Sequence, residues 1–78
     1  MASFDRVREI IADQLGIAEE EIALESSLTS DLGVDSLDMM ELVLSLEEEF
    51  DLEEISETEW ERWHAVAQLV DFLDKRTH

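Results

Sequence analysis

The 78-residue chain carries 22 acidic residues against five Lys and Arg, a formal net charge of −17, and it has neither cysteine nor proline. This charge makes nucleic acids and anionic membrane surfaces poor partners and basic protein surfaces good ones. The missing cysteine excludes disulfides and a protein thiolate nucleophile. With 45% apolar residues in clear periodicity, the composition favours one small folded domain, residues 1–78, over a disordered acidic tail.

Nothing in the sequence suggests a targeting or membrane-spanning segment. Residues 1–6 lack the basic and apolar regions of a signal peptide. No uncharged run approaches the about 20 residues that a membrane-spanning helix needs. We therefore expect a cytoplasmic protein without stable membrane insertion.

A first helix is predicted between Ser3, a good N-cap residue, and Gly16, a natural C-terminal stop. Its apolar residues recur at helical spacing: Phe4, Val7, Ile10, Ile11 and Leu15. Residues 17–34 then form a connection so long that it must pack to suit a compact domain. We expect a helical turn around Ser27 to Asp31, and five apolar anchors: Ile17, Ile22, Leu24, Leu28 and Leu32.

The strongest local signal is the loop-to-helix junction Asp31-Leu32-Gly33-Val34-Asp35-Ser36-Leu37-Asp38. Gly33 permits a tight turn, Asp35 is a good N-cap, and Asp38 takes the place of a capping-box acid. The central helix then runs from about Ser36 to Phe50, so Ser36 lies in its first turn.

The central helix should present an apolar and an acidic face. We expect its inward residues to be Leu42, Val43, Leu46 and Phe50, helped by Leu37 and one of the two methionines at 39 and 40. We expect its outward acids to be Asp38, Glu41, Glu47 and Glu48. The three successive acids 47–49 oppose the helix dipole and should promote fraying at this end.

Two further helices complete the predicted fold. The segment Ser56-Glu57-Thr58-Glu59 is typical of a capping box that opens a short helix to about Arg62. A last helix from about Ala65 to Lys75 should bury four apolar residues: Val66, Leu69, Val70 and Leu73. The sequence thus predicts an all-α fold, a small four-helix bundle with three longer helices and one short, and a long loop between the first two.

Catalysis by the chain itself is not expected. A serine nucleophile needs a base and an oxyanion hole, yet the only histidines are His64 and His78, and no Gly-x-Ser-x-Gly motif is present. The acids around Gly33 do not match the spacing of a calcium-binding loop, so no metal site is expected.

The string Asp-Leu-Gly-Val-Asp-Ser-Leu at residues 31–37, followed by an acidic amphipathic helix, resembles the acyl carrier protein family. The chain is most similar to the free-standing carriers of bacterial fatty-acid synthesis. The resemblance implies that Ser36 carries 4′-phosphopantetheine, attached covalently from coenzyme A. It also implies that Asp35 assists metal and transferase binding, and that acyl intermediates are carried as thioesters on the prosthetic group.

The resemblance further implies partners and an acyl pocket. The partners would be a phosphopantetheinyl transferase and acyl-transfer, synthase and reductase enzymes whose basic patches meet the carrier's acids: Asp35, Asp38, Glu41, Glu47 and Glu48. An ordinary solvated helix surface is the alternative for these acids. The acyl pocket of a monomeric carrier would be lined by Leu28, Leu42, Val43, Leu46, Ile55, Trp63 and Leu69.

Two tryptophans depart from the family pattern. The family usually has a proline before the short helix and small or aliphatic residues within it, whereas this chain has Ser56, Trp60 and Trp63. Trp63 would either limit the length of the buried acyl chain or simply fill the core. Fatty-acid biosynthesis is the first pathway expected and polyketide or other specialised acyl transfer the second. An unmodified acidic helical adaptor for basic partners is the alternative from a different class.

Overall fold

The computed structural model describes residues 4–76, which form three long α-helices and one short one. The long helices are α1 (Phe4–Leu15), α2 (Ser36–Glu49) and α4 (Val66–Arg76), and the short one is α3 (Glu57–Trp60). A single 3₁₀ turn, Glu19–Glu21, lies in the long connection, and the only bridge between extended residues in this part of the chain joins Ser27 to Ala65. The predicted all-α fold with its long first loop is confirmed.

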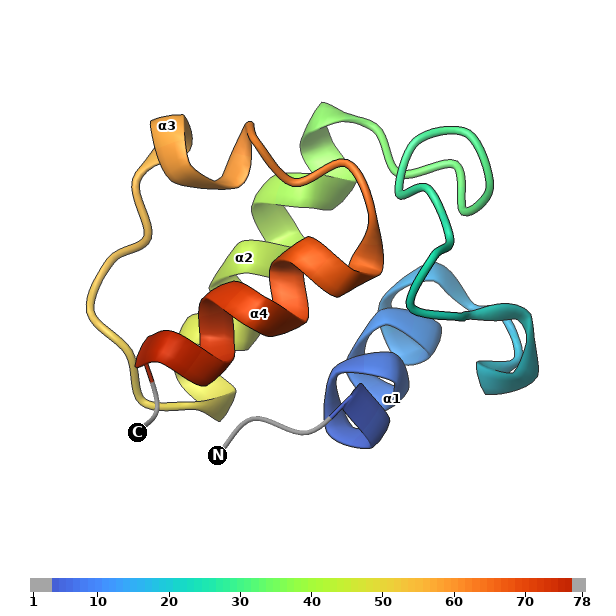
Figure 1. The fold of residues 1–78 in the computed structure, drawn as a ribbon, viewed down its shortest axis with the longest axis horizontal. Coiled ribbons are helices and arrows are strands. Elements are labelled where there is room, and N and C mark those ends of the chain that lie inside the picture. The colour runs from blue at the N-terminus through green and yellow to red at the C-terminus, as the bar shows by residue number, and fades with distance from the viewer. Residues whose placement is uncertain (1–3, 77–78) are drawn as a thin grey trace.

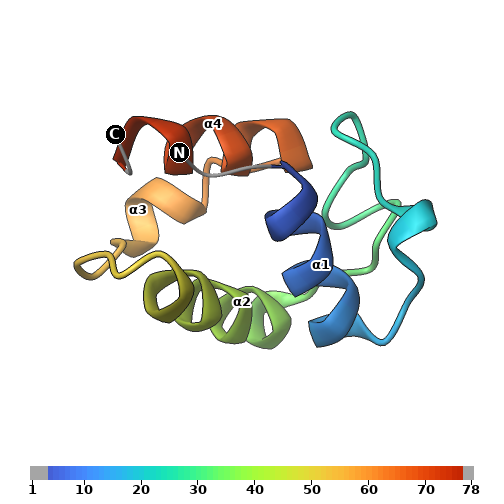
Figure 2. The same ribbon diagram turned by 90° about the horizontal axis from the view of Figure 1, so that it is seen from below.

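The helices enclose one apolar core. Helices α2 and α4 run in the same direction on opposite sides of the molecule, and α1 and α3 lie between them at its two ends (Figures 1 and 2). The residues with the least exposed side chains come from α1, the long loop, α2 and α4: Val7, Ile11, Leu28, Leu42, Leu46, Val66, Leu69 and Leu73.

The first long helix ends as its sequence predicts. Gly16 adopts a φ of 70°, and the N–H groups of Gly16 and Ile17 both donate to the carbonyl of Ala12, at 2.8 and 3.1 Å. This is the glycine-terminated helix end that satisfies free carbonyls of the last turn. Asp51 does the same for α2, with a φ of 53° and the Leu52 N–H on the Glu47 carbonyl at 2.9 Å.

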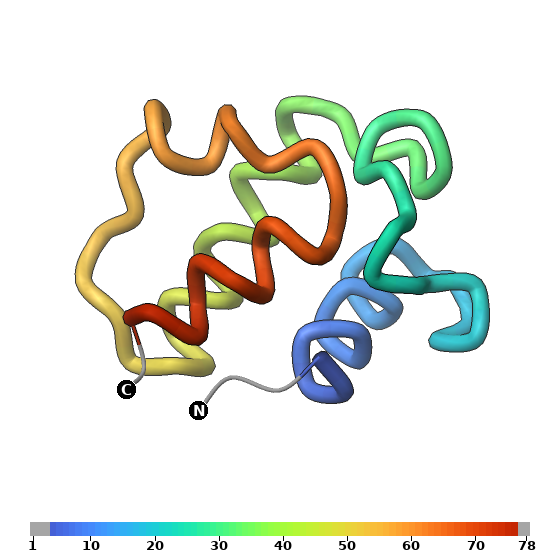
Figure 3. The backbone as a smooth tube through the Cα atoms, viewed as in Figure 1, coloured from blue at the N-terminus to red at the C-terminus, as the bar shows by residue number. Residues whose placement is uncertain are grey.

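The long loop, residues 17–34, packs along one side of the molecule and docks on the start of α4 (Figure 3). Its carbonyls at Leu24 and Ser26 accept the N–H groups of Ala67 and Val66, at 2.8 and 3.1 Å. A helix leaves its first N–H groups without partners of its own, so the loop supplies the cap that α4 needs. The predicted helical turn is confirmed by the Asp31 N–H donating to the Ser27 carbonyl at 3.1 Å.

Several local predictions are wrong. The predicted capping box of α3 is not formed, because the Ser56 hydroxyl pairs with the Thr58 hydroxyl, at 3.1 Å, instead of with the helix backbone. The short helix ends at Trp60, two residues early. Leu24, expected as an anchor, is 41% exposed, and Leu37, expected inside, is 63% exposed.

Candidate functional site

Ser36 is the first residue of α2, and it is exposed. The loop before it is shaped by Gly33, whose φ of 71° few other residues adopt without strain. Val34 is then buried, and its N–H donates to the Leu28 carbonyl at 2.8 Å. The backbone on the N-terminal side of Ser36 is therefore fixed to the core while the serine itself faces solvent.

The acids on either side of Ser36 bond each other's backbone. The Asp38 N–H donates to Oδ1 of Asp35 at 2.8 Å, and the Asp35 N–H donates to Oδ2 of Asp38 at 3.4 Å. This reciprocal capping box, predicted from the spacing, is present. It places two negative charges at the positive end of the helix dipole, which stabilises the first turn.

A groove of about 440 Å³ opens beside Ser36. Its walls come from the loop before α2, from α2 itself, and from the end of α3 and the segment after it. They include Val34, Met39, Trp60, Trp63 and His64. A flexible arm joined to the exposed Ser36 Oγ can lie along these mostly apolar walls. The residues present therefore fit a covalently attached prosthetic group.

A second groove, of about 240 Å³, lies on the other side of α3. Its apolar walls include Met40, Val43, Leu44 and Ile55. Trp60 lines both grooves, and no other described residue is shared between the two linings.

The residues predicted to wall an acyl pocket divide into two groups. Four are at most 1% exposed and belong to the packed core: Leu28, Leu42, Leu46 and Leu69. The other three reach a groove, Val43 and Ile55 at the second and Trp63 at the one beside Ser36. Trp63 is also packed, 6% exposed, with its ring 5.3 Å from that of Phe72.

The predicted docking acids differ in their surroundings. Glu41 and Glu48 are exposed on α2, and Glu41 accepts a hydrogen bond from Nε2 of Gln14 at 2.9 Å. Glu47 is half-buried, and its Oε2 accepts the Ile55 N–H at 2.7 Å. The other two predicted acids, Asp35 and Asp38, form the capping box, so three of the five acids also bond the chain's own backbone.

The outer face of α2 carries an exposed apolar stripe that the sequence pattern did not predict. Leu37, Met40 and Leu44 are 63%, 53% and 58% exposed, and their i, i+3, i+7 spacing puts them within about 60° of one another around the helix. The exposed Glu41 and Glu48 border the same stripe at that periodicity. The available signal was that residues 37–46 hold more apolar side chains than one buried face can use.

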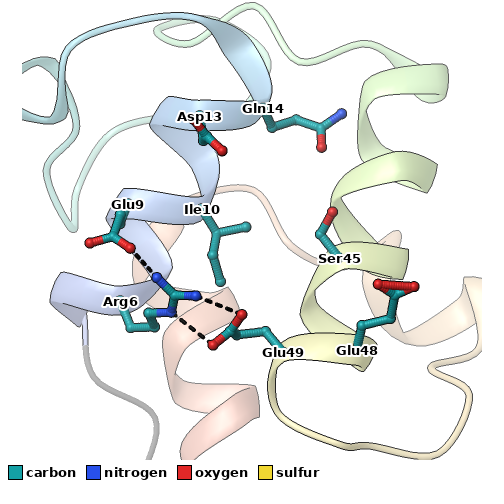
Figure 4. A pocket seen from close by; sticks show the side chains of 8 residues that line it. All are labelled: Arg6, Glu9, Ile10, Asp13, Gln14, Ser45, Glu48 and Glu49. Atoms are coloured by element: carbon teal, nitrogen blue, oxygen red, sulfur yellow. Dashed lines mark hydrogen bonds and ion pairs between the residues drawn. The ribbon is translucent and has the colours of Figure 1, made fainter.

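A larger groove, of about 890 Å³, is at the other end of α2, between α1 and α2 (Figure 4). There Arg6 forms ion pairs with Glu9 and Glu49, the latter at 2.6 Å. The hydrogen bond from Arg6 lowers the pKa of the Glu49 carboxyl, because it favours the charged form. This groove lies about 18 Å along the helix from Ser36, so it is separate from the junction site.

Two features are absent from residues 4–76. No group of three or more His, Cys, Asp or Glu side chains in this range is arranged to hold a metal ion. No helix in it is long and apolar enough to cross a membrane.

Comparisons with known proteins agree with this geometry. Residues 5–73 match the family described as "Phosphopantetheine attachment site". The chain is 49% identical to an acyl carrier protein of Clostridium acetobutylicum, over 95% of each chain, and 44% identical to one of Campylobacter curvus, over 96% of each. The resemblance predicted from the Asp-Ser-Leu motif is therefore confirmed, and the chain belongs to the phosphopantetheine-bearing acyl carrier protein family.

Proposed function

We propose that Ser36 is the attachment site of 4′-phosphopantetheine and that this chain shuttles acyl thioesters between the enzymes of bacterial-type fatty-acid biosynthesis. The observation that carries the proposal is an exposed serine at the first residue of α2, inside the family motif and beside a groove. When bound, the prosthetic group supplies the thiol that the cysteine-free chain lacks.

The chain's own residues present the serine and guide the arm. The capping box of Asp35 and Asp38 holds the first turn in place, and Asp35 also lines the groove beside Ser36, where it can assist a transferase-bound metal. Met39 and the tryptophans offer an apolar surface to the arm. We infer that the carrier does no chemistry of its own and that its partner enzymes act on the group it carries.

The partners are expected to dock on α2. The apolar stripe Leu37, Met40 and Leu44 gives a contact for an apolar patch, and Glu41 and Glu48 beside it attract basic side chains. Charged rims of this kind speed association without making it long-lived, which suits a carrier that visits a transferase, synthases and reductases in turn. We propose a monomer that works in the cytoplasm.

Intact mass spectrometry tests the attachment site. Incubation of the folded chain with coenzyme A, Mg²⁺ and a promiscuous phosphopantetheinyl transferase should add one phosphopantetheine. Ser36→Ala should abolish the addition, whereas Ser45→Ala, a serine elsewhere on α2, should leave it complete. An unmodified wild-type chain would favour the acidic adaptor instead, and modification of the Ser36→Ala variant would place the site on another residue.

The pathway needs a separate test, because a polyketide or other specialised acyl pathway remains the second candidate. The phosphopantetheine form should accept a malonyl group and support chain elongation with purified fatty-acid synthases and reductases. Malonyl loading without elongation, together with elongation by a polyketide synthase, would favour the second pathway.

A further inference from the structure

Trp60 occupies a position that the family pattern does not explain. It is the last residue of α3, and its indole lies between the groove beside Ser36 and the groove lined by Met40, Val43 and Ile55. Ser36 lines the first groove, so an arm attached to Ser36 lies on the side of Trp60 that faces this groove. The second groove continues along α2 on the other side.

The backbone around Trp60 is held from two directions. On one side, Glu47 of α2 accepts the Ile55 N–H at 2.7 Å, just before α3. On the other, Arg76 of α4 donates to Oε1 of Glu59 at 2.7 Å. These two contacts connect the segment around α3 to α2 and to α4, and Trp60 is the one described residue that the two groove linings share.

The two tryptophans differ in their freedom to move. Trp63 is 6% exposed and packed against Phe72, so rotating its indole would open a void in the core. Trp60 is only half-buried, and it packs against the core cluster without belonging to it. Its indole is therefore the side chain between the grooves that can rotate at low cost.

We propose that Trp60 sets the length of acyl chain that this carrier buries, by closing the groove beside Ser36 against the groove along α2. The proposal rests on the attachment of an acyl-carrying arm at Ser36. A short chain lies in the first groove alone. A longer chain gains the apolar walls of the second groove only by displacing the indole, so burial stops increasing at the length that reaches Trp60.

A series of loaded carriers tests the proposal. Wild type and Trp60→Ala are loaded by the transferase from acyl-coenzyme A thioesters of increasing saturated chain length, and loading is confirmed by intact mass. The melting temperature of wild type should stop rising at a shorter chain than that of Trp60→Ala. Beyond that point, each further methylene should protect the variant's thioester from hydroxylamine up to about 4-fold more.

Matched variants separate chain length from stability. Ile11→Val, at a buried position of α1 that lines neither groove, should be less stable at every chain length but should reach its plateau at the wild-type length, because it leaves both grooves and Trp60 in place. Trp60→Leu, which keeps an apolar side chain on α3, replaces Trp60→Ala if the alanine variant loses its helical circular dichroism. A shared plateau for wild type and the folded Trp60 variant would overturn the proposal.

Fluorescence gives a readout independent of stability. The chain has two tryptophans, so in Trp63→Phe all indole emission comes from Trp60. Its emission should stay constant for short chains and change abruptly at the plateau length. Constant emission over the whole series would overturn the role of Trp60 while leaving attachment intact, whereas absence of loading would overturn the attachment at Ser36 as well.

Discussion

The carboxylate of Glu47 joins the last part of α2 to the loop that precedes α3. Its Oε2 lies 2.7 Å from the Ile55 nitrogen, and Ile55 itself is 3% exposed in the core. A charged acceptor on a partly buried N–H stabilises more than a neutral one, and removing it leaves a donor that water reaches poorly. The Glu47 carboxylate is therefore part of what holds the fold together.

We predict that Glu47→Ala lowers the free energy of unfolding by about 1–3 kcal/mol, because the Ile55 N–H loses its partner. Glu47→Gln, which keeps an acceptor oxygen, should lose less. Urea unfolding followed by circular dichroism measures both. The matched control is Glu48→Ala, the exposed neighbour on α2, which should stay within about 0.5 kcal/mol of wild type. Equal losses of unfolding free energy in Glu47→Ala and Glu48→Ala would mean that the Glu47 carboxylate, like that of Glu48, does not stabilise the fold.

Residue-scale features could be predicted from the sequence where their signals are local. The Asp35–Asp38 box and the Gly16 helix end each depend on residues within one or two turns, and both are present. The Ser56 box failed because a nearby hydroxyl, that of Thr58, competes for the serine. The hydrogen bond between Glu47 and Ile55 depends on the path of the chain after α2, which the local spacing of residues does not determine. Among 22 acids, no sequence feature distinguishes Glu47 as the one that makes this bond.

Among the elements, α2 is the one with two apolar faces, one buried and one exposed. Its buried face is Met39, Leu42, Val43 and Leu46, at helical spacing. Leu37 is two residues from Met39, about 200° around the helix, so it falls on the opposite side. The length of the helix could be predicted from the sequence. Its outward residues could not, because residues 37–46 are mostly apolar and periodicity alone does not separate the two faces.

We predict that Glu41→Lys weakens binding to a basic partner such as the transferase by up to about 10-fold, because it replaces attraction with repulsion beside the apolar stripe. The dependence of the affinity on salt should also become shallower. Calorimetric titration at several NaCl concentrations measures both effects, and circular dichroism should show an intact fold.

Glu20→Lys is the matched control for this variant, since it makes the same change of net charge at an exposed site in the long loop. Its affinity should fall much less than that of Glu41→Lys. Equal effects of the two substitutions would mean that partners sense the total charge of the carrier and not the outer face of α2.

For the whole molecule, the net charge of −17 opposes the compact state through repulsion between acids. Nineteen acids and no Lys or Arg lie between residues 9 and 61, and the cations are left to both ends of the chain. There they form ion pairs, Arg6 with Glu49 across α1 and α2, and Arg76 with Glu59 across α4 and α3. Both pairs are partly exposed, so each contributes little to stability on its own and cannot offset the repulsion of the rest.

The dimensions of the fold decide how far that repulsion reaches. Its longest extent is 27 Å and its radius of gyration is 11.2 Å. The Debye length is about 30 Å at 0.01 M salt and about 10 Å at 0.1 M. At the lower concentration every acid therefore repels every other acid in the folded chain, and at the higher one only neighbours interact strongly. Unfolding separates the charges, so low salt disfavours the compact state.

We therefore predict that the melting temperature rises with NaCl over this range, and rises more per mole with Mg²⁺, whose double charge screens acids more effectively. The measurement is thermal unfolding by circular dichroism at fixed pH. The control is a triple variant, Glu20→Gln, Glu25→Gln and Glu53→Gln, which neutralises three exposed acids away from α2. Its melting temperature should start higher and depend less on salt. A wild-type melting temperature that does not change with salt would show that water already screens the repulsion between the acids. Net charge would then not limit the stability of this fold.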